Sequence, residues 1–591
     1  MKLRSCLRVA TMCGMLLVCR LATLEADSYD VLTEPQVAVK MRDGVVLRAN
    51  VFRPKAEGRF PVLLERTPYN KEGESKFPAK AAARGYVVVI QDCRGRFASQ
   101  GEWTPFKNEA QDGYDTIEWA ARLPYSNGKV GLIGSSYMGA TQMLAAVSQP
   151  PHLAGLLPEF TASDYHDGWV YQGGAFELWF NLTWTGRHLA ADTLKRWYEK
   201  HTNIEDSVGK LPLSGYSLPG LELTEAVLAP YYREWIDHPS YDSFWKQLSI
   251  EERYDRIDVP AYHTGGWYDI FLRGTLRNYI GIETKGGSES ARHGQHLLIG
   301  PWAHGPYGGK SSPLSFGLPT GYYAWEGREE LLFRWYDHVL KGVDNGIEHD
   351  KPVKIFVMGE NQWREEDSWP LARARTTPYY LNSGGRANTE GGDGILLTSL
   401  PQDSPPDRFI YDPADPVPTV GGALCCAGDF VAGAFDQNAV EKRVDVLVYS
   451  TPAFTENVEV TGPITLDLYV SSTARDTDFT GKLVDVWPNG FAQNLADGIL
   501  RARYRNSRQE PELLELGRVY EVTVDLGATS NVFLKGHRLR LEVSSSNFPR
   551  FDRNLNTGED AGKTSQWLKS TNTIYHDRRR PSALVLPIEP R

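Results

Sequence analysis

The chain has only six cysteines among its 591 residues. Cys6, Cys13 and Cys19 lie in the first twenty residues, which leaves Cys93 and the adjacent pair Cys425–Cys426. So few cysteines in so long a chain exclude a disulfide framework, and adjacent cysteines rarely bridge each other because the geometry is strained. We therefore expect the last three cysteines to be buried free thiols, and we expect stability to come from packing.

Positive charge is not in excess either. The chain carries 64 Lys and Arg against 74 Asp and Glu, which gives a net charge of -10 and a pI near 5.8. A short basic cluster stands at Arg578–Arg580, close to the end of the sequence. This balance argues against nucleic acid or an anionic lipid surface as the main partner. We expect a small-molecule partner instead, and the sequence leaves open whether the chain forms a homo-oligomer.

Apolar runs long enough to cross a membrane are also missing, because a comfortable span needs about 20 residues. The run Val9–Val18 follows three basic residues and precedes Ala22 and Ala26. Basic residues, a short apolar core and small residues, in that order, are typical of a secretory signal peptide. We predict a signal peptide over residues 1–26 and a secreted or periplasmic protein. An uncleaved anchor, a lipoprotein acylated at Cys19 and a mis-assigned start are weaker alternatives.

The chain is too long for one hydrophobic core, so several domains are expected. Over residues 27–150, short apolar runs alternate with stretches of helical spacing. Strands that alternate with helices are typical of a mostly parallel sheet covered on both faces. The strand-like runs are Val62–Glu65, Tyr86–Ile90 and Val130–Ile133, and the helical stretches are Ala79–Arg84, Gln111–Arg122 and Tyr137–Val147.

Residues 151–250 interrupt this alternation, since they are rich in Trp, Tyr and Leu with many breaks. Four aromatic side chains there fall at i, i+3, i+4 and i+8, which predicts one face of a helix. Such a face either packs in the core of a cap or lines a substrate pocket. Strands and helices alternate again over residues 251–346, so we predict a helical cap inserted into an α/β core. The candidate pocket residues are Phe176, Trp179, Phe180 and Trp184.

Over residues 347–591, helical periodicity disappears and short β-rich runs follow one another between Pro, Gly and Asp clusters. That pattern is typical of a β-sandwich or jelly roll. The predicted fold class is therefore an α/β-hydrolase core with an inserted helical cap and a C-terminal all-β jelly-roll domain. A jelly roll alone would also suit a binding protein such as a lectin.

A strand that runs into a Gly-x-Ser turn and then into a helix stands at residues 131–139. This order is typical of a nucleophile elbow, in which a serine sits on a tight turn above the sheet. The N-terminus of the following helix favours the negative charge that develops in acyl transfer. The elbow predicts Ser136 as the nucleophile. One departure is Met138, which replaces the usual second glycine, with Gly139 one residue later.

A serine nucleophile needs a histidine base and an acid that orients it, and in this fold the chain order is serine, acid, histidine. Asp269 follows a predicted strand that ends at Thr264, and His304 follows the predicted strand Leu297–Ile299. We therefore predict a triad of Ser136, Asp269 and His304, which a pure binding protein would have no reason to keep. No Cys, His and Asp cluster has metal-ligand spacing, so we predict neither a metal nor another cofactor.

Several short motifs accompany the elbow and span nearly the whole mature chain. They are Arg66–Tyr69, Gln91–Arg96, Gly134–Gly139, Gly266–Asp269, Gly300–His304, Trp335–His338, Leu340–Gly342 and Asn547–Asn554. In these motifs the sequence resembles the CocE/NonD-type serine hydrolases. That family includes bacterial cocaine esterase, α-amino-acid ester hydrolases and glutaryl-cephalosporin acylases, and it is related to the Xaa-Pro dipeptidyl-peptidases.

The resemblance implies the same triad and adds an oxyanion hole. Its two donors would be the phenol of Tyr69 and the backbone N–H of Tyr137. It also implies cleavage of an ester or amide through an acyl-enzyme. The alternatives are an Xaa-Pro dipeptidyl-peptidase, an amino-acid ester hydrolase or a β-lactam acylase. The peptidase and the amino-acid ester hydrolase need acidic groups for a substrate amine, for which Glu177 is the nearest candidate, so a neutral or apolar acyl group is favoured.

Overall fold

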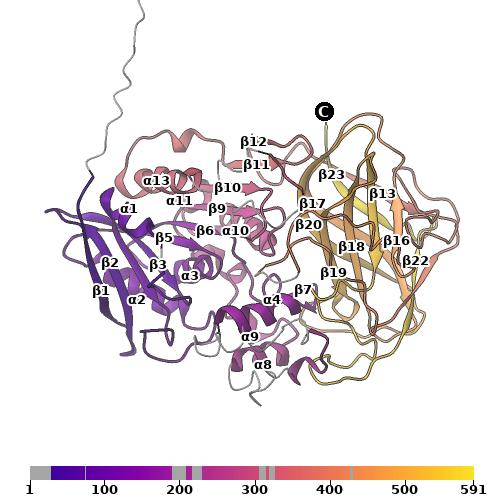
Figure 1. The fold of residues 1–591 in the computed structure, drawn as a ribbon, viewed down its shortest axis with the longest axis horizontal. Coiled ribbons are helices and arrows are strands. Elements are labelled where there is room, and N and C mark those ends of the chain that lie inside the picture. Colours follow the sequence, from indigo (N-terminus) through magenta and orange to yellow (C-terminus); the bar gives the residue numbers. More distant parts are fainter. Residues whose placement is uncertain are drawn as a thin grey trace, which may run out of the picture.

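The computed structural model describes residues 28–73, 75–189, 208–215, 229–304, 314–317, 326–425 and 430–590. The predicted signal peptide and Cys426 lie outside these residues. Within the described ranges, no helix combines enough length and apolar character to cross a membrane. The chain forms two halves side by side, an α/β half drawn in indigo to pink and a β half drawn in orange to yellow (Figure 1).

The α/β half is built on a 10-stranded sheet with the order β1-β2-β4-β3-β5-β6-β9-β10-β11-β12. From β4 to β11 in this order all neighbours are parallel. Antiparallel pairs close the two edges. The strands are β1 Val31–Lys40, β2 Val46–Pro54, β3 Phe60–Thr67, β4 Val87–Asp92, β5 Ser126–Ser135, β6 Leu153–Glu159, β9 Ala261–Gly266, β10 Gln295–Gly300, β11 Val353–Val357 and β12 Gln362–Glu366.

Helices cover both faces of this sheet, because successive residues of a strand point to opposite sides. Along β3, Leu64 packs in one cluster with residues of α2 and α3, and Leu63 packs in another with residues of α1 and α13. The sheet is therefore buried on both faces, as the alternating pattern predicts. The helices are α1 Phe77–Ala83, α2 Glu109–Ala121, α3 Tyr137–Ala146, α10 Leu272–Lys285, α11 Glu289–His293 and α13 Glu326–Lys341.

Between β6 and β9, short elements replace the regular alternation. The prediction of one helical face from Phe176 to Trp184 is wrong at its start. Phe176 ends a small hairpin whose turn is made by Gly173 and Gly174, both at positive φ, and the helix begins two residues later. The elements are β7 Tyr171–Gln172, β8 Ala175–Phe176, α4 Leu178–Thr183, a π-helical turn Trp184–Leu189, α8 Pro230–Asp237 and α9 Ser243–Lys246.

The β half is an 11-stranded arrangement in which almost all pairs are antiparallel, and its main apolar cluster also includes residues of the α/β half such as Trp267 and Leu297. An α/β core with an inserted, largely helical segment and a C-terminal all-β domain matches the predicted fold class, while the residue boundaries of the domains stay predictions. The strands are β13 Arg375–Asn382, β14 Ile395–Leu397, β15 Asp407–Tyr411, β16 Leu447–Ser450, β17 Val458–Ser472, β18 Asp478–Val486, β19 Ala492–Arg501, β20 Tyr520–Phe533, β21 Arg538–Ser544, β22 Ser570–Tyr575 and β23 Ala583–Glu589.

The prediction of buried free thiols is confirmed for one cysteine and wrong for another. Cys93 is a buried free thiol in the core of the α/β half, as expected. Cys425 is disulfide-bonded, so the prediction of a free thiol at this position is wrong. Cys93 and Cys425 are the cysteines among the described residues.

Candidate active site

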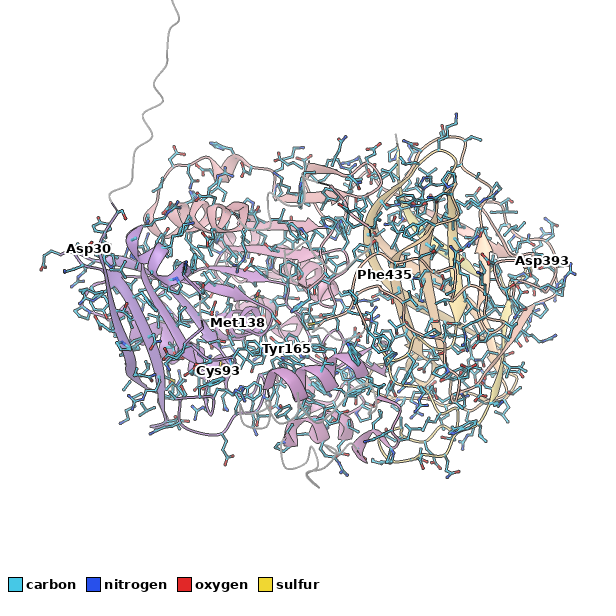
Figure 2. All side chains as sticks on the ribbon, in the orientation of Figure 1. Asp30, Cys93, Met138, Tyr165, Asp393 and Phe435 are labelled. Carbon is cyan, nitrogen blue, oxygen red and sulfur yellow. The ribbon has the colours of Figure 1, made fainter. Side chains whose placement is uncertain are left out.

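The predicted elbow has the backbone that its role requires. Ser136 follows β5 directly, has φ 61° and ψ -123°, and precedes the first residue of α3. A non-glycine residue in this region carries strain that is typical of functional sites. The turn with these dihedral angles places Ser136 at the C-terminal end of the sheet, between β5 and α3. Met138, two residues after Ser136, lies in the α/β half, far from Asp393 at the outer edge of the β half (Figure 2).

The departure at Met138 has a packing explanation. Gly134 has φ 123°, and a Cβ there would lie 2.5 Å from the Cβ of Met138. A Cβ on Gly139 would lie 2.8 Å from the side chain of Thr161. Gly134 therefore makes room for Met138, while Gly139 lets α3 pack closely against the segment that follows β6. The elbow needs both glycines although the second is displaced by one residue.

Asp269 and His304 meet because β9 and β10 are parallel neighbours, so the loops that follow them leave the sheet at the same edge. His304 Nδ1 lies 2.8 Å from Asp269 Oδ1. The Asp269 side chain is fully buried, whereas 17% of the His304 side chain is exposed. Phe271 contacts the imidazole edge-to-face at 5.1 Å between ring centroids. The histidine is thus oriented on one side and accessible on the other.

Tyr69 lies against the nucleophile. Its phenol accepts a hydrogen bond of 2.8 Å from Nε1 of Trp184, and Ser136 is close enough to lower the pKa of the phenol. Burial raises the pKa of Tyr69, so the phenol keeps its proton at neutral pH. Among the described contacts, Ser136 has no hydrogen bond to His304. Such bonds are often long in enzymes without substrate and shorten in the complex.

The loop that carries Tyr69 is fixed by the segment after β4. Asp92 accepts hydrogen bonds from the backbone N–H and the ammonium group of Lys71, at 2.7 and 3.1 Å. Nε of Arg96 donates to the carbonyl of Pro68 at 2.8 Å. These contacts hold the residues on either side of Tyr69. The motifs Arg66–Tyr69 and Gln91–Arg96 therefore contact each other in the fold. The charged side chains of Asp92 and Arg96 therefore support the loop that carries Tyr69.

Aromatic side chains surround the triad residues on the side of the inserted segment. Phe180 and Trp184, two of the candidate pocket residues, stack on each other at 5.6 Å. The other two point elsewhere, since Phe176 contacts Tyr171 and Tyr232 and Trp179 contacts Phe430. We call the group around Trp184 the aromatic wall, and it consists of Phe106, Tyr165, Trp169, Phe180, Trp184 and Phe271.

The aromatic wall includes residues that the sequence pattern did not indicate. Trp169 stacks on Phe271 at 4.2 Å and lies 5.2 Å from Trp184, so it joins the neighbours of His304 and of Tyr69. Phe271 could have been found from its position two residues after Asp269. Trp169 gives no such signal, because its place depends on contacts between segments far apart in the chain.

Glu177, the candidate for binding a substrate amine, is already matched by a cation. It is 2% exposed and lies 3.6 Å from Arg550, which also pairs with Asp497. Burial raises the pKa of Glu177 to about 7, against the opposing effect of Arg550. One oxygen of this buried carboxylate faces Arg550, and the other has no hydrogen-bond partner among the described residues.

The β half contributes directly to the surroundings of the acid. Leu424 forms an isolated parallel β-bridge with Asp269. A small cavity of about 30 Å³ lies between this segment and the loop of Asp269, and Arg273, Asp497 and Arg550 are among its lining residues. Among the residues that the structure describes, no group of three or more His, Cys, Asp or Glu side chains could hold a metal ion.

Two family models match the chain. Residues 43–306 match the X-Pro dipeptidyl-peptidase (S15 family), and residues 345–585 match the X-Pro dipeptidyl-peptidase C-terminal non-catalytic domain. The chain is 39% identical over 570 residues to the cocaine esterase of Rhodococcus sp. (strain MB1 Bresler), which covers 93% of this chain and 98% of that protein.

Solved structures of the same overall shape include an α-amino acid ester hydrolase with 26% identity and a TM-score of 0.80, which covers 98% of this chain and 100% of that one. An aminopeptidase from the archaeon Thaumarchaeota archaeon has 26% identity and a TM-score of 0.78, and it covers 96% of this chain and 97% of that one. These likenesses extend over both halves of the molecule.

Proposed function

Because the chain belongs to the CocE/NonD-type serine hydrolases of the S15 family, we propose that it hydrolyses esters with a neutral, apolar acyl group through a covalent acyl-enzyme on Ser136. The family makes the chain a serine hydrolase with ester hydrolase activity. The proposal adds the residues of the triad and of the oxyanion hole, and the chemical class of the acyl group.

In the proposed mechanism, Ser136 attacks the ester carbonyl carbon while His304 takes the serine proton. Asp269 accepts a hydrogen bond from Nδ1 of His304, which leaves Nε2 to act as the base. The oxyanion accepts hydrogen bonds from the Tyr69 phenol and the Tyr137 N–H. His304 then gives its proton to the departing alcohol. Water attacks the acyl-enzyme with His304 as base again, and the carboxylic acid leaves.

The backbone of Tyr137 supports the second donor role. Tyr137 is the first residue of α3, so its N–H has no acceptor inside the helix and points along the positive end of the helix dipole. The phenol of Tyr69 supports the first, since it lies close to the nucleophile and keeps its proton. Two preorganised donors of this kind stabilise a tetrahedral intermediate.

The aromatic wall is the observation that carries the acyl preference. Trp184 contacts Tyr69 and Phe271 contacts His304, so aromatic side chains flank both partners of the nucleophile. Apolar walls bind apolar groups by removing their surface from water. An ammonium group in the same place would lose its hydration without gaining a carboxylate, which is costly.

A side-by-side assay tests the proposal. The substrates are p-nitrophenyl acetate, p-nitrophenyl benzoate, the methyl ester of phenylglycine and Gly-Pro-p-nitroanilide, with the Ser136→Ala variant as the blank for each. We expect kcat/KM to be highest for a p-nitrophenyl ester and lowest for the two substrates that carry an ammonium group. A higher kcat/KM for Gly-Pro-p-nitroanilide or for the amino-acid ester contradicts the proposed acyl class.

A further inference from the structure

A single buried carboxylate contacts two residues that support the proposed oxyanion hole. We call these two residues, Tyr137 and Arg66, the arms of the oxyanion hole. Glu109 is the first residue of α2 and is 2% exposed. One of its oxygens faces the residue after the nucleophile, and the other faces the strand that leads to Tyr69. We infer that Glu109 is a positioning residue that sets the distance between the two oxyanion donors. This inference rests on the proposed roles of Tyr69 and Tyr137.

The first arm is the ring of Tyr137. Its phenol donates a hydrogen bond of 2.9 Å to Oε1 of Glu109 and accepts one of 2.8 Å from the backbone N–H of Phe106. The ring is fully buried and stacks on Phe106 at 5.2 Å. Burial and the Glu109 carboxylate raise the pKa of Tyr137, so the phenol stays a donor. The hydrogen bonds of its phenol thus fix the position of Tyr137, whose backbone N–H is the proposed oxyanion donor.

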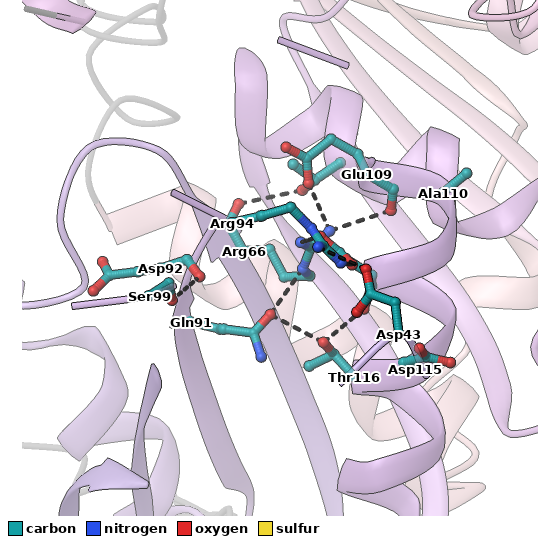
Figure 3. Close-up of polar contacts among 12 residues, drawn as sticks. Asp43, Arg66, Gln91, Asp92, Arg94, Ser99, Glu109, Ala110, Asp115 and Thr116 are labelled. Atoms are coloured by element: carbon teal, nitrogen blue, oxygen red, sulfur yellow. Dashed lines mark hydrogen bonds and ion pairs between the residues drawn. The ribbon is translucent and has the colours of Figure 1, made fainter. Parts of the chain in front are cut away.

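The second arm is Arg66, three residues before Tyr69 at the end of β3. Nη1 of Arg66 donates to Oε2 of Glu109 at 2.7 Å and to the backbone carbonyl of Glu109 at 3.2 Å. Nε of Arg66 donates to Oε1 of Gln91 at 2.9 Å. Figure 3 shows this fork of contacts between Arg66 and the neighbouring helix and strand. The point from which the Tyr69 loop leaves the sheet is therefore tied to Glu109.

A role limited to stability explains this arrangement poorly. Taking a carboxylate and a guanidinium out of water costs free energy, and a buried ion pair often adds little net stability. A carboxylate with one oxygen on each arm does fix the separation of the arms. A misplacement of about 1 Å at a site of reaction can cost about 10²-fold in rate. A role in fixing the separation of the two oxyanion donors would explain why a charged group is buried here.

The test uses two variants and a matched control on the full chain. Glu109→Gln removes the charge with little change in shape, and Tyr137→Phe removes only the phenol hydroxyl. Glu118→Gln is the control, because Glu118 lies on the same helix, is 6% exposed and pairs with Nδ1 of His152 at 2.9 Å. The number of active sites is titrated with a p-nitrophenyl phosphonate, so that misfolded protein does not enter kcat.

We expect kcat per titrated site to fall about 10- to 100-fold for Glu109→Gln and Tyr137→Phe, with KM changed less than about twofold. Inhibition by phenylboronic acid, which forms a tetrahedral adduct on the serine, should weaken by a similar factor. Inhibition by benzoate, which does not need the oxyanion hole, should stay the same. Glu118→Gln should leave all these values unchanged. A purely structural role would lower the number of titrated sites and not the rate at each site.

Two results separate this inference from the proposed function. If Tyr69→Phe lowers kcat strongly while Tyr137→Phe and Glu109→Gln stay within about twofold of the unaltered protein, the positioning role is wrong and the oxyanion hole stands. If Tyr69→Phe also has normal kcat, the proposed oxyanion hole is wrong and the inference fails with it. Should Glu109→Gln not fold, the kcat of Tyr137→Phe decides alone.

Discussion

The two halves of the molecule each hold a histidine bonded to an aspartate, and the two pairs have the same length. His304 Nδ1 lies 2.8 Å from Asp269 in the α/β half, and His576 Nε2 lies 2.8 Å from Asp407 in the β half. The second pair even has a serine beside it, since Ser383 Oγ lies 3.1 Å from His576 Nε2. Ser383 and Asp407 contact the same nitrogen of His576, however, whereas a catalytic triad places the serine and the acid on opposite ring nitrogens.

The difference lies in what surrounds each pair. His576 is fully buried, and its Nδ1 is bonded to Ser404 at 2.9 Å. Asp407 also accepts hydrogen bonds from Tyr449 at 2.8 Å and from Ser383 at 2.6 Å. His304 instead is partly exposed beside a serine on strained backbone. A satisfied, buried network stabilises a fold, whereas access and strain are what a reactive site needs.

The largest expected effect comes from replacing the serine of each half with alanine in separate variants. Ser136→Ala should lower kcat by at least about 10⁴-fold, because the nucleophile is lost, and Ser383→Ala should leave kcat unchanged. Steady-state kinetics with the best ester measures both. Ser135→Ala is a second control that should be mild. A dead Ser135→Ala protein beside an active Ser136→Ala protein would show that the elbow is shifted by one residue.

The next effect concerns the donor beside the nucleophile. Tyr69→Phe removes one hydroxyl and almost no volume, so stability should barely move. The oxyanion charge exists only in the transition state and intermediate, so we expect kcat about 10²–10³-fold lower with KM little changed. A slow amide substrate suits the measurement, since chemistry then limits the rate. A kcat within about threefold of the unaltered protein contradicts the proposed role of Tyr69.

A third variant should act on stability and spare the chemistry. Asp407→Asn removes the charge that binds His576, Ser383 and Tyr449 in a fully buried network. Breaking such a network costs about 3 kcal/mol of unfolding free energy. Urea unfolding followed by fluorescence measures the loss, and kcat per titrated site should stay normal. Lost activity per site with normal stability would mean that the β-half pair takes part in catalysis.

The smallest expected effect is a pH dependence of stability that belongs to the β half. Burial and the neighbouring Glu542 raise the pKa of Glu441 to about 8, against the opposing effect of Arg540. Since the folded pKa lies above the unfolded value of about 4.5, this stability is fully present below pH 4.5 and is lost as pH rises through 8. We expect the Tm to fall by a few degrees between pH 6 and pH 9.

Glu441→Gln isolates this pH effect, because an amide keeps the shape and does not ionise. Differential scanning fluorimetry at pH 6 and pH 9 should give a smaller fall in Tm for the variant than for the unaltered protein. Glu118→Gln in the α/β half serves as the control and should keep the original fall. Equal falls in all three proteins would place the titrating group elsewhere.

Local pattern predicted the candidate site residues that lie at strand ends. Ser136, Asp269 and His304 each follow a strand of the parallel sheet, and the strands are visible as short apolar runs. Phe176 was misplaced because the Gly173–Gly174 turn, which is a local signal, outweighs the helical spacing around it.

Contacts between distant segments were beyond the sequence pattern. Trp169 contacts Phe271, which lies about a hundred positions later in the sequence, and no local pattern near either residue predicts this contact. The disulfide state of Cys425 was missed for a related reason, since the number and spacing of cysteines do not show which thiols packing brings together. Spacing predicts which residues share an element, and packing decides which elements meet.

The bridge between Asp269 and Leu424 has a consequence for how such a protein can be recombined. The backbone of the proposed triad acid is held by a segment that enters from the other half, so the boundary between the halves is not a neutral place to cut. A chimera that exchanges the β half for that of a relative must also inherit a loop that reaches Asp269. Engineers who shuffle these halves would do best to carry residues 422–425 together with the catalytic half they came with.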